Sequence, residues 1–92
     1  MPNLFVIRGY KVYFWSDENS EPIHVHISKG KPTPNATKLW LTEKGGCILA
    51  HNKGQIPENE LRDLTELIVA QYFVICAKWK EFFRTDKIEF YC

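Results

Sequence analysis

The sequence has no excess of either charge, no long hydrophobic run and no recognisable leader. Twelve Lys and Arg residues against eleven Asp and Glu give a formal net charge of +1, so binding to nucleic acid would require a local basic patch. No stretch reaches the roughly 18 apolar residues of a membrane span. Residues 1–4 show no basic region followed by an apolar run. We therefore expect a cytosolic protein with no membrane partner.

Cysteines are also few. Cys47, Cys76 and Cys92 are odd in number and widely spaced, which fits neither a disulfide framework nor a Cys-x-x-Cys zinc pattern. Reduced thiols are expected, and Cys76 falls in an apolar segment typical of a core residue rather than a nucleophile. Glycine-rich phosphate loops, Gly-x-Ser-x-Gly motifs and clustered acidic pairs are absent as well. These absences predict no cofactor.

The hydrophobic pattern that is present changes its period once along the chain. Ninety-two residues with 45% hydrophobic content suit a single domain over residues 1–92. Period-two alternation and turn residues predict strands over residues 4–8, 10–15, 23–29 and 37–42, with a fifth short one over 47–50. From Pro57 the period becomes helical for roughly 25 residues. The predicted fold is α+β: a mainly antiparallel sheet of four to five strands packed on one long C-terminal α-helix.

Alternation also assigns the two faces of this sheet. If the strands pair as a meander, one face is apolar and packs on the helix, and its members are Val12, Phe14, Val25, Ile27, Leu39 and Leu41. The other face mixes rings and cations, and its members are Lys11, Tyr13, Trp15, His24, His26, Lys38 and Trp40. Flat rings stack on bases and lysines neutralise phosphates, so Lys11, Tyr13, Trp15 and Trp40 are candidate binding residues for single-stranded RNA. The alternative is that cross-strand aromatic pairs simply stabilise a sheet exposed on one side.

Two histidines stand side by side on this second face. His24 and His26 are two residues apart in a strand and therefore share a face, which we expect to be open. With Lys38 beside them they form a candidate catalytic set for RNA cleavage by general acid/base chemistry. Two histidines also supply two metal ligands, with Glu21, His51 or Cys47 as a third. Because no zinc-like spacing completes the set, we expect no bound metal.

The helical segment is apolar around most of its circumference. Residues 67–77 read LIVAQYFVICA, with Gln71 the only strongly polar side chain, and one sheet face cannot cover every side of such a helix. Val69, Phe73 and Cys76 lie off the main stripe and are candidate interface residues for a protein partner or a homodimer. The alternative is coverage by residues 48–49 and by a C-terminal segment whose alternation over 87–91 suggests a last strand.

Several of these motifs together resemble a known bacterial family. They are Ile7 to Ser16, the run Glu21-Pro22-Ile23-His24-Val25-His26-Ile27, the strand Lys38-Leu39-Trp40-Leu41, Asn52 to Ile56 with Glu60-Leu61, and the terminal helix with Trp79. In this order they resemble the domain of unknown function 4160 family over most of the chain, from residue 1 to about Phe83. The chain departs from the family pattern at Ile23, where a second proline is usual, and in the tail Arg84–Cys92.

The resemblance implies a component of a small operon, encoded beside another short protein in an arrangement similar to toxin-antitoxin modules. A helix that is apolar all round agrees with such a pairing. We therefore expect a small protein-interaction module of a toxin-antitoxin-like pair. A small metal-independent ribonuclease using His24 and His26 is the alternative, and a metal-binding module is a further one.

Overall fold

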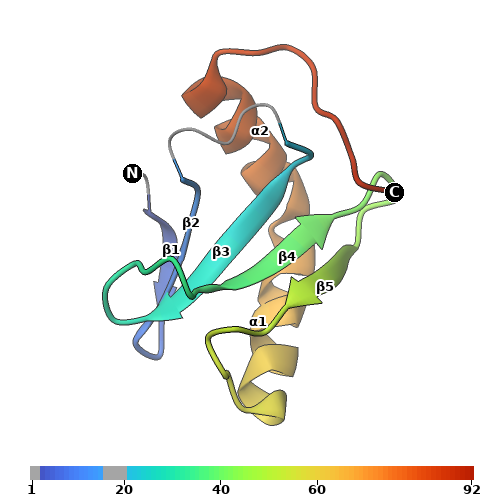
Figure 1. Cartoon of the computed structure of the whole chain (residues 1–92). Coiled ribbons are helices and arrows are strands. Elements are labelled where there is room, and N and C mark those ends of the chain that lie inside the picture. Colours follow the sequence, from blue (N-terminus) through green and yellow to red (C-terminus); the bar gives the residue numbers. More distant parts are fainter. Residues whose placement is uncertain (1–2, 16–20) are drawn as a thin grey trace.

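The computed structural model describes residues 3–15 and 21–92 as a five-stranded antiparallel sheet with two helices behind one face (Figure 1). The strands lie in sequence order across the sheet. The elements are β1 (Asn3–Ile7), β2 (Tyr10–Tyr13), β3 (His24–Lys29), β4 (Thr37–Leu41), β5 (Cys47–His51), α1 (Glu58–Ala70) and α2 (Tyr72–Phe83). This architecture confirms the predicted α+β fold, the meander and the fifth strand.

Short turns set the register of the hairpins. The β1–β2 turn has only two residues, Arg8 and Gly9, with φ of 52° and 83°. Positive φ at both central positions matches the twist of two antiparallel strands, which is why a glycine occurs here. The turn pairs Ile7 with Tyr10. Between β4 and β5, Gly45 has φ of 95° and Gly46 N donates to Thr42 Oγ1 at 3.0 Å.

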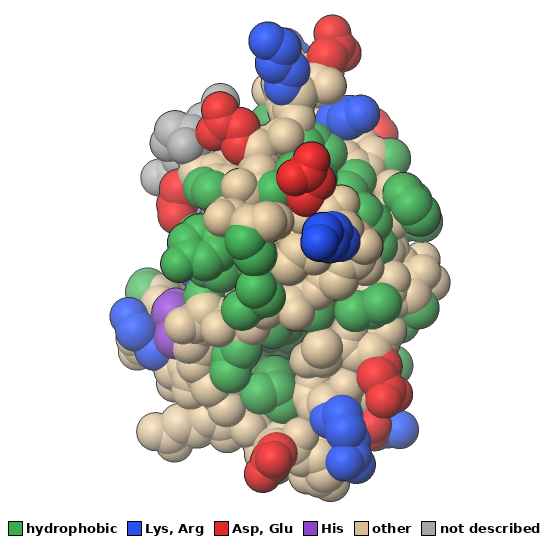
Figure 2. Space-filling model, turned by 90° about the vertical axis from the view of Figure 1, so that its right-hand side faces the viewer, with side chains coloured by type: hydrophobic (Ala, Val, Ile, Leu, Met, Phe, Trp, Pro, Cys, Tyr) green, Lys and Arg blue, Asp and Glu red, His purple; other side chains and the backbone are tan. Residues whose placement is uncertain are grey.

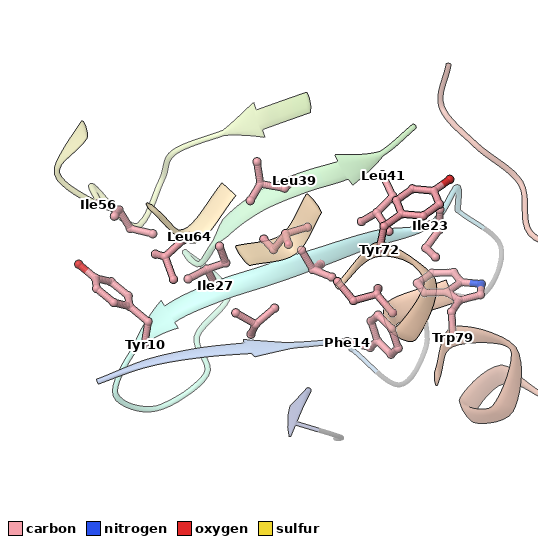
Figure 3. Close-up of a cluster of buried hydrophobic side chains, with 14 residues drawn as sticks. Tyr10, Phe14, Ile23, Ile27, Leu39, Leu41, Ile56, Leu64, Tyr72 and Trp79 are labelled. Atoms are coloured by element: carbon pink, nitrogen blue, oxygen red, sulfur yellow. The ribbon is translucent and has the colours of Figure 1, made fainter. Parts of the chain in front are cut away.

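The core lies between the sheet and the helices. All six residues predicted for the apolar sheet face are at most 1% exposed, because alternation places them together against the helices. Figure 3 shows Tyr10, Ile56 and Leu64 at one end of this cluster and Phe14, Tyr72 and Trp79 at the other. The helices contribute one buried stripe at helical spacing, which consists of Leu64, Ile68, Tyr72, Ile75 and Trp79.

The helical segment is divided at one residue. Gln71, with φ of −103° and ψ of 18°, separates α1 from α2, and its N–H is shared between the carbonyls of Leu67 and Ile68 at 3.0 and 3.2 Å. The two helices still follow one another along the same face of the sheet (Figure 1). The sequence predicted one continuous helix of about this extent, since Gln is a good helix former. Among the described residues no helix is long and apolar enough to cross a membrane.

The loop into α1 is held by side-chain hydrogen bonds. Asn52 Oδ1 accepts from Thr37 Oγ1 at 2.6 Å and from Ile56 N at 3.0 Å, while Asn52 Nδ2 donates to Ile56 O at 3.0 Å. Gly54 N donates to Thr37 Oγ1 at 3.2 Å. A Cβ at Gly54 would lie 2.8 Å from that hydroxyl oxygen, so any other residue here requires Thr37 to move. The Asn-x-Gly pattern therefore fastens β4 to the start of α1.

The C-terminal tail crosses the end of the sheet. Arg84, with φ of 52°, ends α2, and the tail then passes the end where β3 begins and β4 stops (Figure 1). Ile23 N donates to Glu89 O and Glu43 N to Cys92 O, both at 2.9 Å. Residues 87–91 are not a strand, contrary to the sequence pattern. A segment that crosses two strand ends meets one residue of each and cannot form a ladder.

Candidate functional site

The ring and cation residues predicted for the second sheet face do lie together there. Cross-strand neighbours are Tyr13 and His26, His26 and Lys38, and His24 and Trp40. We call this surface the ring face, and it comprises Lys11, Tyr13, Trp15, His24, His26, Lys38 and Trp40. The alternation of side chains along three adjacent strands is sufficient to bring all seven to one side.

The histidine pair is buried, which corrects the expectation of an open face. His24 is 0% and His26 7% exposed, and their ring centroids are 5.0 Å apart at an interplanar angle of 87°. The His24 ring also lies edge-on to Trp40 and Trp79, at 5.4 and 5.6 Å. Trp79 belongs to α2, so the helix reaches past the end of the sheet to His24. The alternation of residues along β3 does not predict that a residue of α2 covers His24.

Hydrogen bonding fixes the protonated nitrogen of His24. Its Nδ1 lies 2.8 Å from Pro22 O, and a carbonyl oxygen only accepts, so Nδ1 carries the proton. His26 stacks on Tyr13 at 5.7 Å and meets Trp15 edge-on at 6.0 Å. The Tyr13 hydroxyl in turn donates to Thr33 O at 3.5 Å and accepts from Thr33 N at 3.3 Å. These contacts hold both imidazoles within a packed layer of rings.

Lys38 has two partners on the ring face. Its Nζ lies 3.0 Å from Glu21 Oε1 and 4.1 Å from the centroid of the Trp40 ring. The lysine side chain is 15% exposed and that of Glu21 40%. Across the next strand, the pKa of His51 is lowered by burial and by the positive charges of Lys53 and Lys38. Lys38 is therefore a cation held against Trp40, and its charge is balanced by the carboxylate of Glu21.

The arrangement limits the chemistry that this face offers. Among residues 3–15 and 21–92, no group of three or more His, Cys, Asp and Glu side chains is placed to hold a metal ion; Glu21, His51 and Cys47 do not complete a set with the histidine pair. Burial raises the pKa of the Cys47 and Cys76 thiols, which keeps them protonated and weakly nucleophilic. Reaching the buried His24 would require a substrate to displace neighbouring rings.

A second surface is apolar and exposed. Phe73 is 82% and Val69 43% exposed, as predicted for the helix, whereas Cys76 is only partly exposed and packs against the core. On the edge strand, Leu49 is 44% exposed and lies opposite the buried Leu39, so its side chain is on the helix side of the sheet. Ile48, which is 42% exposed, lies opposite Trp40 and is therefore on the ring face. Figure 2 shows hydrophobic side chains gathered on this side of the molecule. We call the surface formed by Val69, Phe73 and Leu49 the β5–helix surface. The sequence offered residues 48–49 only as an alternative cover for the helix and did not place Leu49 in an exposed patch with it.

A hollow that the sequence did not suggest lies between the β1–β2 turn and α1. Its volume is about 240 Å³, and it is partly open to solvent. Two side-chain contacts bridge it, Arg8 Nη1 to Asp63 Oδ2 at 3.0 Å and Tyr10 Oη to Glu60 Oε2 at 2.9 Å. Each joins the N-terminal hairpin to the first turns of α1. The two pairs that bridge this hollow are 50 and 55 residues apart in sequence, so no local pattern could reveal it.

These observations define a small α+β domain with a packed ring face and an apolar edge. A family model, Domain of unknown function (DUF4160), matches residues 9–80, and the chain belongs to this family. The matched region holds all of the ring face, the Asn-x-Gly loop and most of both helices, and it excludes β1 and the tail. Searches of the curated proteins and of the solved structures gave no match.

Proposed function

We propose that the protein is a protein-interaction module, a component of a two-protein pair of the toxin-antitoxin type, and that its partner docks on the β5–helix surface. One observation carries the proposal: Phe73 is 82% exposed on a helix whose buried stripe lies on its other side. Large apolar side chains on a surface are costly in water, and contiguous patches of them mark interaction sites.

The exposed edge of β5 is a second reason to place the partner on this side of the molecule. β5 has β4 as its neighbour and, among the described residues, no strand on its outer side. The strand Cys47–His51 contains no Lys, Glu or Pro, although such residues commonly protect edges from pairing with other chains. A partner that adds a strand here would use backbone hydrogen bonds, with the apolar side chains of β5 setting specificity.

Burial of the histidines favours interaction over catalysis. A general acid/base pair must lie within hydrogen-bond reach of the proton it moves, and His24 is 0% exposed between two tryptophan rings. Lys38, the third residue of the candidate catalytic set, is paired with Glu21. A ribonuclease based on His24, His26 and Lys38 would need these contacts to open first. The β5–helix surface needs no rearrangement.

The test is the mass of the protein in solution, alone and mixed with the product of the neighbouring gene. Light scattering at micromolar concentration should show a complex, and Phe73→Glu should weaken it at least about tenfold, since a charge in an apolar interface is left without a partner. Lys78→Glu is the matched control, because Lys78 is an exposed residue of the same helix outside the surface. A monomer under all conditions, or equal effects of the two variants, would contradict the proposal.

A further inference from the structure

The tail places a second aromatic ring on Trp40. Tyr91 stacks on the indole with centroids 4.9 Å apart and planes 6° apart, nearly parallel. Tyr91 is nevertheless 61% exposed, so most of its surface is in water while one face rests on Trp40. A flat ring held parallel on an indole is the geometry that a nucleobase adopts on an aromatic platform.

The anchors of the tail lie on either side of this ring and do not include it. Ile88 and Phe90 pack against the core, and the backbone bonds are made by Glu89 O and Cys92 O. The tyrosine side chain can therefore rotate away from Trp40 without releasing the tail. This rotation would expose one face of the Trp40 indole, whose position is fixed by β4.

Charge beside the platform suits a phosphate. Lys38 Nζ lies 4.1 Å from the Trp40 ring centroid, and its carboxylate partner, Glu21, is itself 40% exposed at the side chain. A phosphate group could replace that carboxylate on Lys38 at little cost, because the exchange is of one anion for another. Stacking and an adjacent cation are the two elements of sequence-tolerant recognition of single strands.

We propose that Trp40 and Lys38 form a binding site for a base and its phosphate in single-stranded RNA, and that Tyr91 occupies this site as an internal competitor. The platform lies inside the family match over residues 9–80, and Tyr91 lies outside it. The binding site therefore belongs to the family domain, and the competitor belongs to the tail. This inference is independent of the β5–helix surface and uses different residues.

The experiment measures the fluorescence anisotropy of a labelled oligoadenylate of about ten nucleotides titrated with the full-length protein. Tyr91→Ala should bind about two- to tenfold more tightly than the parent, the range expected when a competing aromatic stack is removed. Tyr91→Phe keeps the ring and should bind like the parent. Trp40→Leu should abolish binding, and Lys38→Gln should weaken it and reduce its dependence on salt. Competition with adenosine monophosphate distinguishes a free nucleotide from a strand as the ligand.

The results of this experiment distinguish an RNA site at Trp40 from a site for a protein partner. Equal affinities of the parent and Tyr91→Ala would overturn the proposal, as would an absence of binding in every variant that circular dichroism shows to be folded. If Trp40→Leu does not fold, the comparison of Tyr91→Ala with Tyr91→Phe still decides. A third outcome would assign Trp40 to a protein partner. In that case Trp40→Leu no longer forms the protein complex and the parent does not bind RNA, which would overturn the RNA site.

Discussion

Thr37 Oγ1 donates a hydrogen bond of 2.6 Å to Asn52 Oδ1, and this contact joins β4 to the loop that starts α1. The same carboxamide accepts from Ile56 N and donates to Ile56 O. Thr37 is 0% exposed, so water cannot easily replace a hydrogen-bond partner that its hydroxyl group loses. The loop geometry consequently depends on one side chain.

Replacing this carboxamide should be costly. Asn52→Ala removes three hydrogen bonds and leaves the Thr37 hydroxyl proton without an acceptor and the Ile56 N–H and C=O without their side-chain partner, which we expect to lower the free energy of unfolding by about 2 to 4 kcal/mol. Asn59→Ala, at an exposed position on α1, should change it by less than about 0.5 kcal/mol. Urea denaturation of both variants checks this; similar midpoints would show that the network contributes little.

Gly54 provides a steric test of the same loop. Its substitution by Ala places a Cβ 2.8 Å from Thr37 Oγ1 and 3.3 Å from Thr37 N, and relief requires movement of a buried strand. We expect Gly54→Ala to destabilise the protein by about 1 to 3 kcal/mol. At Gly46 the nearest contact of a Cβ is 3.4 Å, so Gly46→Ala is the control and should be much milder in the same thermal unfolding assay.

The burial of His24 gives a third prediction. A surface histidine in a strand should tolerate Thr within about 0.5 kcal/mol. His24 is 0% exposed and hydrogen-bonded to Pro22 O, so His24→Thr should lower the free energy of unfolding by about 1 to 3 kcal/mol. His51→Thr on the edge strand is the matched control and should stay near the parent. A His24→Thr variant as stable as the His51→Thr variant would mean that the ring packing is not needed for stability.

Alkaline pH should weaken the fold through two tyrosines. Burial raises the pKa of Tyr10, helped by its hydrogen bond to Glu60 and by that negative charge, and burial likewise raises the pKa of Tyr72. A raised pKa means that the folded state holds the proton more tightly than the unfolded state. The resulting stabilisation is complete below the unfolded value of about 10 and is lost as pH rises through the folded values.

Tyr10→Phe removes one of these titrations. The variant should lose some stability at neutral pH, about 0.5 to 1.5 kcal/mol for the hydrogen bond to Glu60. Its unfolding free energy should then fall less steeply than that of the parent above about pH 10. Urea midpoints measured across this range test the claim, and parallel curves for the two proteins would contradict it.

Local patterns predicted most of this fold because its contacts follow the chain. Strands that pair with their sequence neighbours need only alternation and turn residues, and the buried residue Val25 and the ring-face residue Trp40 were both placed correctly in this way. The break at Gln71 was not predictable, since the residue itself favours a helix. Cover of His24 by Trp79, and of Trp40 by Tyr91, depends on residues about fifty positions away, and sequence periodicity contains no information on such packing.

The last prediction concerns metal at the histidine pair. His24 Nδ1 is protonated toward Pro22 O, which leaves this ring at most one nitrogen for coordination. Within the described parts of the chain no third ligand joins the pair. A zinc site built from two imidazoles leaves coordination to water and should be weak, so untagged protein should contain far less than one metal ion per chain by elemental analysis. About one zinc or nickel ion per chain, lost in His24→Ala but retained in His51→Ala, would overturn this.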